Sequence, residues 1–486
     1  MISKSFLKSS IIYTIGGALP MLASFILLPF YVGYLDAHQF NALNFYIGIS
    51  LLFQILFSYS IDSYFGVKYS QLATDKTEQK RFVGTISNLL IIIGLSIILI
   101  SAIAGPYIFP IVFTELDQVH FWPFGFMSII TAFFNSYFKA GTNALIYFNQ
   151  PKPFILYNSI NFVATVGLSI LGLHISPDTI SGPIYARFIS GLMIFILAFV
   201  SFKQNSVFAF DKKFLKDLRM FCTPYILFVL FLWVLGNLDR YFLKSQIEAD
   251  SLAAYILLLT CFFGFEFIQN SLSATIFPKI FEIWTNNGKN ETTKESNRYY
   301  NVFTAISILL LILFCFLIPL VIKIAVPFKT SYYQSFQFIG VIAAGYATRS
   351  IINFYLSTIL YSKNTILLIK IFGYSSVVQI IATYFLVKEF GLTGAIYAGI
   401  ITKITQVCFA WVLTRNIFIY NFNYMKILGI PLLYIAINVI MYQIIPEYSI
   451  PAYAVQFLVF GSILYFIFKN EIKTVYLQFF GKKSGA

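Results

Sequence analysis

Apolar runs of roughly 20 residues follow one another along the whole chain, separated by short polar stretches. A helix of that length crosses the hydrocarbon core of a bilayer. The runs are continuous in Leu, Ile and Phe, whereas the strands of a membrane β-barrel alternate between apolar and polar residues. The pattern therefore predicts about fourteen transmembrane helices, at 9–33, 40–66, 82–104, 119–145, 154–175, 180–202, 219–243, 251–277, 299–323, 334–360, 364–387, 392–414, 427–445 and 452–468.

The composition agrees with this pattern. Of 486 residues, 59% are hydrophobic and only 11% are charged, with a mean hydropathy of +0.80. A soluble protein of this length carries about 25% charged residues. The fold class predicted is an all-α polytopic membrane protein with little mass outside the bilayer.

The positive charges are distributed unevenly between the loops. If the N-terminus is cytoplasmic and the spans alternate, about 23 of the 33 Lys and Arg residues fall in cytoplasmic segments and about four in outer loops. The positive-inside rule produces this asymmetry. It predicts an even number of spans with both termini in the cytoplasm, and it accounts for most of the net charge of +14.

Nine charged residues lie in the interior of the predicted spans, in addition to Arg219 and Lys323 at span ends. A charge at the centre of a bilayer costs about 2.5–3.5 kcal/mol on the mildest insertion scale, so such residues usually face a polar cavity or one another. Three are acidic: Asp62, Asp239 and Glu266. Six are basic: Lys139, Arg187, Arg240, Arg349, Lys370 and Lys403. The excess of cations indicates that an anionic molecule crosses this protein.

The depths of these cations suit a relay across the membrane. Arg349 and Lys403 lie near the middle of their spans, whereas the other four lie nearer to one face or the other. Arginine binds phosphate through two parallel hydrogen bonds, and lysine acts as a point charge. The alternative for each cation is a structural ion pair or a side chain that reaches the membrane surface.

The acids leave alternatives open. Glu266 lies in mid-span, where it is either a proton or sodium site or the counter-ion of a cavity cation. Asp239 and Arg240 are either part of a gating or structural network or in contact with substrate. Asp62, near the cytoplasmic end of its span, is interpreted as a local cap or a residue at a contact between lobes.

Similar segments recur about 212 to 214 residues apart. The segment around Phe40 resembles that around Leu252, and 145–149 resembles 359–363. The offsets predict two six-helix units, 1–205 and 206–414, followed by two further helices and a cytoplasmic tail in 415–486. Each unit begins in the cytoplasm, so the repeat is parallel, with an axis along the membrane normal and a substrate site between the halves.

Proline lies in the first helix of each predicted unit, at Pro20 and Pro29 in one and at Pro224 in the other. Proline removes a helical hydrogen bond and permits a bend. These positions are candidate hinges for a change of access, with a static kink as the alternative.

Several short segments resemble bacterial polysaccharide flippases. They are KSSIIYTIGGALP at 8–20, FILLPFYVGYL at 25–35, GNLDRYF at 236–242 and GLTGAIYAG at 391–399. That family, which includes O-antigen-type flippases, belongs with the multidrug and toxic-compound extruders and the lipid II flippases. The resemblance implies two six-helix lobes, a central cavity and alternating access in a bacterial inner membrane.

The same resemblance implies what the protein transports and with what it works. The implied substrate is a polyprenyl-diphosphate-linked oligosaccharide, moved from the cytoplasmic to the outer leaflet for lipopolysaccharide or other polysaccharide synthesis. Membrane lipids, a polysaccharide polymerase and a chain-length regulator are the implied partners of a monomeric chain. The six membrane cations then offset the cost of desolvating the diphosphate.

Two other classes of function remain as alternatives. A multidrug–cation antiporter of the same superfamily is expected to have an acidic rather than a basic cavity. A membrane polysaccharide polymerase is expected to have a large outer loop, whereas the longest outer loops predicted here have about 10–15 residues. No phosphate loop, paired-carboxylate motif or metal-ligand spacing appears in the sequence, which predicts no enzymatic activity, no cofactor and no metal. Basic residues scattered over short loops also disfavour nucleic-acid binding.

Overall fold

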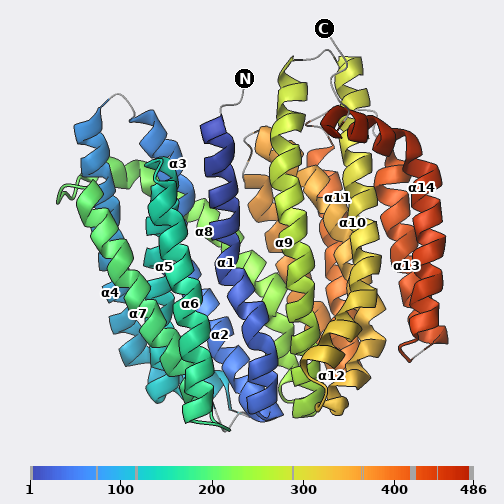
Figure 1. The fold of residues 1–486 in the computed structure, drawn as a ribbon, viewed down its shortest axis with the longest axis horizontal. Helices are drawn as coiled ribbons and strands as arrows, with labels where there is room; N and C mark the ends of the chain where they lie inside the picture. The colour runs from blue at the N-terminus through green and yellow to red at the C-terminus, as the bar shows by residue number, and fades with distance from the viewer. Residues whose placement is uncertain are drawn as a thin grey trace. The chain divides into compact units, whose positions relative to one another are not determined.

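The computed structural model describes residues 4–72, 75–114, 119–286, 289–362, 364, 366–415, 417, 423–445 and 447–480. Helices make up nearly all of these residues, and no strand occurs among them. The chain divides into two compact units, Met1–Asn237 and Leu238–Ala486. Figure 1 shows the order of the helices, coloured from blue at the N-terminus to red at the C-terminus.

The first unit is a bundle of long antiparallel helices. Its helices are α1 (Lys4–Tyr34), α2 (Ala37–Ser58), α3 (Ile61–Gln71), α4 (Lys76–Val112), α5 (Phe126–Tyr147), α6 (Pro151–Ile175) and α7 (Ser181–Asn205), and the short η1 (Phe121–Gly125) precedes α5. Helix α6 packs between α1 and α7, while α5 packs against α2 and α7. Helix α8 (Lys212–Leu243) begins in this unit and ends in the second.

The second unit contains six further helices. They are α9 (Ala249–Asn286), α10 (Lys289–Ala325), α11 (Ile339–Tyr361), α12 (Ile366–Thr414), α13 (Ile430–Ile444) and α14 (Ile450–Phe480), with the short η2 (Thr330–Phe338) and η3 (Met425–Gly429) before α11 and α13. Helix α11 packs against α12 and α13, and α10 packs against α9 and α14. Most residues of α11 are buried, which makes it the centre of this unit.

Every predicted span lies on helical structure, so the predicted all-α polytopic fold is confirmed. Within the described residues, eleven helices are long and apolar enough to cross a membrane, and the chain is a multi-pass membrane protein. Helices α5 and α11 are not among the eleven, although spans are predicted there. Both pack against other helices, where small and polar residues are tolerated better than in contact with lipid.

The predicted span boundaries can be compared with the breaks in the helices. The boundary predicted between 364–387 and 392–414 coincides with a kink inside α12, where two helical segments meet at Gly391. Gly391 has φ 54°, a left-handed conformation that glycine adopts without steric cost. The span predicted at 40–66 is instead divided between α2 and α3, because Tyr59 and Ser60 are both left-handed and interrupt the helix.

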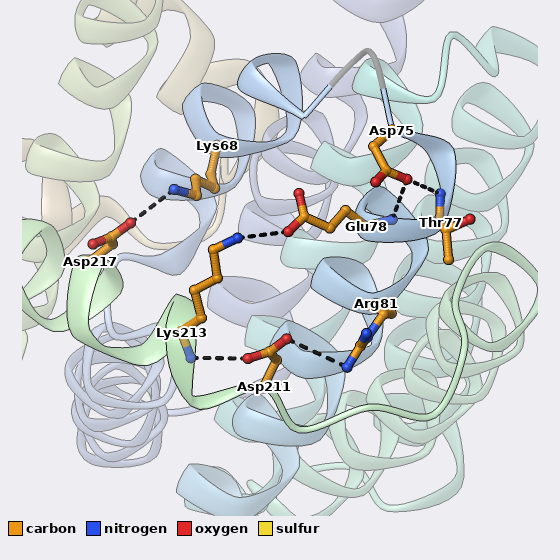
Figure 2. Close-up of polar contacts among 8 residues, drawn as sticks. All are labelled: Lys68, Asp75, Thr77, Glu78, Arg81, Asp211, Lys213 and Asp217. Atoms are coloured by element: carbon orange, nitrogen blue, oxygen red, sulfur yellow. Dashed lines mark hydrogen bonds and ion pairs between the residues drawn. The ribbon is translucent and has the colours of Figure 1, made fainter.

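The beginning of α8 is held in the first unit by both apolar and charged contacts. Phe214, Leu218 and Cys222 recur on one face of the helix and join the buried core formed with α3, α4, α5 and α7. At the same end, Lys68 pairs with Asp217 at 2.8 Å and Lys213 pairs with Glu78 at 2.8 Å. Figure 2 shows these pairs beside Asp75, which caps α4 by accepting backbone hydrogen bonds from Thr77 and Glu78.

Candidate functional site

An ion pair in the second unit joins two of the predicted membrane charges. Arg349 on α11 lies 3.1 Å from the carboxylate of Glu266 on α9. Its guanidinium also donates a hydrogen bond of 3.0 Å to the side-chain oxygen of Asn270. Glu266 and Asn270 are four residues apart, so α9 presents both to Arg349 from one face. The side chains of Arg349 and Glu266 are 31% and 30% exposed, which leaves the pair accessible to a polar ligand.

Lys403 reaches the same region from α12. Its amino group lies 4.2 Å above the ring of Tyr346, a cation–π contact. Tyr346 and Arg349 are three residues apart on α11 and share a face. The Tyr346 ring stacks on Phe262 of α9, with centroids 5.0 Å apart and planes 9° apart. This stack fixes the platform on which the lysine rests.

The end of α8 supplies the remaining two charges. The carboxylate of Asp239 accepts a hydrogen bond from the hydroxyl of Tyr255 on α9 and a second, of 2.9 Å, from the backbone N–H of Arg240. Arg240 is 7% exposed, and within the described residues its Nε and one terminal nitrogen have no hydrogen-bond partner. A buried guanidinium with unused donors favours the binding of an acceptor group.

These five residues form one electrostatic group. The charges of Glu266, Arg349 and Asp239 all act on Lys403. The same three charges and that of Arg240 act on the neighbouring Tyr346. We call Asp239, Arg240, Glu266, Arg349 and Lys403 the C-terminal charge cluster. It contains one more cation than acid. An anion that enters it competes with Glu266 for Arg349 and finds donors on two arginines.

The other predicted site residues lie elsewhere in their units. Lys139 on α5 pairs with Asp62, which lies in the first turn of α3, at 2.9 Å. Arg187 on α7 lines a small, partly open hollow together with hydroxyl groups of α2 and α5, among them Tyr46 and Ser128. Lys370 is exposed near the beginning of α12 and has no ion pair within the part of the chain that the structure describes. The roles predicted for these residues stay predictions.

The three candidate hinge prolines lie inside continuous helices. Pro20 and Pro29 are within α1, and Pro224 is within α8. Their predicted part in a change of access also stays a prediction.

The predicted repeat stays a prediction. So do its boundaries, 1–205, 206–414 and 415–486.

Sequence reasoning missed the uncharged members of the site. Tyr346, Phe262, Tyr255 and Asn270 carry no charge, so their presence in a span is not costly enough to attract notice. The available signal was the spacing on α9, where Phe262, Glu266 and Asn270 recur every four residues. The spacing of Tyr346 and Arg349 on α11 adds to it.

Comparisons of sequence and of structure give different results. No protein-family model and no curated protein sequence matches this chain. Among solved structures, the lipid II flippase MurJ in an inward closed conformation aligns over 97% of this chain and 99% of its own, with TM-score 0.63 and 16% identity. An outward-facing multidrug resistance MATE transporter of the MOP superfamily aligns over 85% and 95%, with TM-score 0.59 and 13% identity.

A MOP superfamily transporter from Pyrococcus furiosus also aligns, over 85% of this chain and 96% of its own, with TM-score 0.55 and 12% identity. For that transporter, the reverse polarity of the binding pocket suggests a different function. All these identities are low, so the likeness concerns the fold. The chain has the fold shared by the lipid II flippase MurJ and the MATE transporters of the MOP superfamily.

Proposed function

We propose that this protein is a flippase for a polyprenyl-diphosphate-linked oligosaccharide. It moves the substrate from the cytoplasmic to the outer leaflet of a bacterial inner membrane, for O-antigen-type or related polysaccharide synthesis. The chain works by alternating access, without enzymatic chemistry, and Pro20, Pro29 and Pro224 permit its helices to bend. Its proposed partners are a polysaccharide polymerase and a chain-length regulator, and the chain is monomeric.

The observation that carries this proposal is the cation excess of the C-terminal charge cluster. Two arginines and a lysine lie on membrane-spanning helices with only two acids among them. A diphosphate has several acceptor oxygens that lose water on entering the membrane, and charge-assisted hydrogen bonds from arginine replace that water. A carrier of organic cations is served better by an excess of acids.

The fold supports the same class of substrate. The lipid II flippase MurJ aligns over nearly the full length of both chains. The multidrug transporter aligns over a smaller share of this chain. Likeness of fold alone leaves the sugar unspecified, so the lipid-linked diphosphate is the part of the substrate proposed here.

A reconstituted assay tests the function. The substrate is a polyprenyl-diphosphate oligosaccharide that carries a dithionite-sensitive fluorophore on its sugar. In proteoliposomes that contain the protein, we expect external dithionite to quench this fluorophore faster than in protein-free vesicles. A labelled phosphatidylcholine should remain protected at the vesicle rate, because it lacks the diphosphate. The Arg349→Ala, Lys403→Ala variant serves as the matched protein control.

Two outcomes would oppose the proposal. Equal exposure of the diphosphate lipid and of phosphatidylcholine would indicate a non-selective scramblase. Uptake of an organic cation such as ethidium in exchange for protons or sodium, with no movement of the lipid, would favour the multidrug antiporter instead.

The proposed topology has its own test. Reporter tags inserted after about residue 78, 208 or 290, and at the C-terminus, are expected to report the cytoplasm, since these segments are rich in lysine and arginine. Tags near residue 117, 178 or 329 are expected to report the outside. A cytoplasmic report near residue 117 together with an external C-terminus would overturn the fourteen-span arrangement.

A further inference from the structure

Helix α4 has a face that meets lipid. Ile92, Leu95, Leu99 and Ile103 recur at intervals of three and four residues and are 49%, 60%, 63% and 65% exposed. Large apolar side chains on one face of a membrane-spanning helix, exposed within their unit, contact the acyl chains. The stripe therefore marks the lipid side of α4.

The connector between α7 and α8 crosses the same face nearer to the beginning of α4. Continued backwards, the stripe passes through Asn88, Gly84 and Arg81. The side-chain amide of Asn88 donates to the carbonyl of Ala209 at 2.9 Å, and Arg81 lies 3.6 Å from the carboxylate of Asp211. We call residues 206–211 the strap. Figure 2 shows Asp211, the last residue of the strap, beside Arg81 and Lys213.

The strap lies directly against the backbone of α4. The N–H of Val207 donates to the carbonyl of Lys80 at 3.3 Å, and the N–H of Asp211 donates to the hydroxyl of Thr85 at 3.1 Å. A Cβ on Gly84 would lie 1.9 Å from the carbonyl oxygen of Val207, so only glycine permits this approach. The strap is thus fixed at the end of the apolar stripe, where the first turns of α4 carry the charged residues Lys80 and Arg81.

The apolar side chains of the strap remain uncovered. Phe208 is 90% exposed, Val207 51% and Phe210 47%, although the backbone beside them is hydrogen-bonded to α4. Aromatic residues at the level of the headgroups anchor membrane proteins at the interface. The position of the strap gives these three side chains access to lipid.

Exposed lysines flank the strap. Lys80 contacts it through its backbone, Lys203 lies in the last turn of α7, and Lys212 begins α8. No ion pair engages these three amino groups among the described residues, whereas the neighbouring Lys213 is paired with Glu78. Basic residues beside interfacial aromatics attract anionic lipid headgroups.

We propose that the strap, together with Lys80, Lys203 and Lys212, is a binding surface for anionic phospholipids of the cytoplasmic leaflet. The lysines contact the headgroup phosphates, and Phe208 and Phe210 enter the upper acyl region. This surface holds the beginning of α8 at the membrane, and it is separate from the C-terminal charge cluster and from the transported lipid.

Lipid exchange tests the charges. The purified protein is equilibrated in detergent with equal amounts of phosphatidylglycerol and phosphatidylcholine, and retained lipid is measured by native mass spectrometry. We expect a preference for phosphatidylglycerol that falls more than tenfold in the Lys80→Gln, Lys203→Gln, Lys212→Gln variant, since each such lysine contributes about fivefold. The matched control, Lys152→Gln, Lys294→Gln, Lys388→Gln, removes as many exposed lysines that are neither part of the strap nor among its three flanking lysines, and it should retain the preference.

An unchanged preference in the strap variant would overturn the proposal, as would an equal loss in the control. Displacement of phosphatidylglycerol by inorganic phosphate at the same concentration would also overturn it, because that would indicate a phosphate site rather than a lipid surface. Transport of the substrate is not part of this readout, so the result is independent of the proposed function.

Quenching by brominated lipid tests the aromatics. In the Phe208→Trp variant, the fluorescence added to that of the four native tryptophans is expected to be quenched by phosphatidylcholine brominated near the headgroup. Iodide in the buffer should have little effect on it. Quenching by iodide but not by bromolipid would place residue 208 in water and overturn the insertion.

Discussion

The Arg349→Ala, Lys403→Ala variant is expected to lose nearly all flipping of the diphosphate lipid while still inserting into the membrane. Arg349 offers charge-assisted hydrogen bonds to an entering phosphate, and each such bond contributes about 1.5–3 kcal/mol. Loss of one therefore lowers the initial rate roughly tenfold to a hundredfold. The initial rate of flipping should be lower in the double variant than in either single variant. The measurement is the rate of dithionite exposure in proteoliposomes of matched protein content.

The substitutions around this variant separate charge from geometry. Arg349→Lys should retain part of the rate if charge dominates, and little if two parallel hydrogen bonds are required. Lys388 is exposed and lies outside the cluster, so the Lys388→Ala variant should flip the diphosphate lipid at close to the rate of the unmodified protein. Flipping at the normal rate by a well-inserted double variant would eliminate the cation relay.

Removal of Arg349 also leaves Glu266 without its partner, and this effect needs a control. The Arg349→Ala, Glu266→Gln variant removes both charges of the pair. The loss of folding stability that an unpaired carboxylate causes is therefore avoided. We expect this variant to regain stability relative to Arg349→Ala but not to regain transport. Recovery of transport would indicate that Arg349 serves structure rather than substrate.

Glu266→Gln is expected to destabilise the protein and to be rescued by neutralising Arg349. The carboxylate lies 3.1 Å from the guanidinium, as a counter-ion would. Breaking a fully buried pair costs about 3–5 kcal/mol, and because both side chains are about 30% exposed the cost here should be smaller. The apparent Tm in detergent and the rate of flipping are measured for Glu266→Gln, Arg349→Gln and the double variant.

The two roles left open for Glu266 predict different results in double-mutant cycles with Arg349 and Lys403. As a counter-ion, Glu266→Gln lowers Tm, and Tm recovers when Arg349 or Lys403 is neutralised as well, with a coupling energy of about 0.5–3 kcal/mol. Transport stays low in these double variants, because a cation that binds substrate is lost as well. As a proton or sodium site, Glu266→Gln loses gradient-driven transport at normal Tm. A normal Tm in the Glu266→Gln variant would contradict the counter-ion role.

The sequence determined the fold class because the cost of exposing polar backbone to lipid leaves little choice. Runs of about 20 apolar residues must be helices if they cross the bilayer, and each predicted span lies on a helix. Exact boundaries depended on local backbone conformation. Nothing in the pattern showed that Tyr59 and Ser60 would divide the span predicted at 40–66.

The sequence also identified which charges are costly, because a charge in a span is conspicuous whatever its neighbours are. It could not choose their partners. Glu266 and Arg349 are 83 residues apart, and their contact depends on how α9 packs against α11. Periodicity gives the face of one helix, whereas the pairing of two faces is decided by side-chain packing between them.

Only the tertiary structure revealed the contributions of uncharged residues. The stack of Tyr346 on Phe262 beneath Lys403, and the strap across Gly84, unite segments far apart in the chain. Tyrosine, phenylalanine and glycine are common in any membrane helix, so their presence carries no signal until the neighbours are known. Hydrophobic patterning thus specified what lies in the membrane, and close packing decided which side chains meet there.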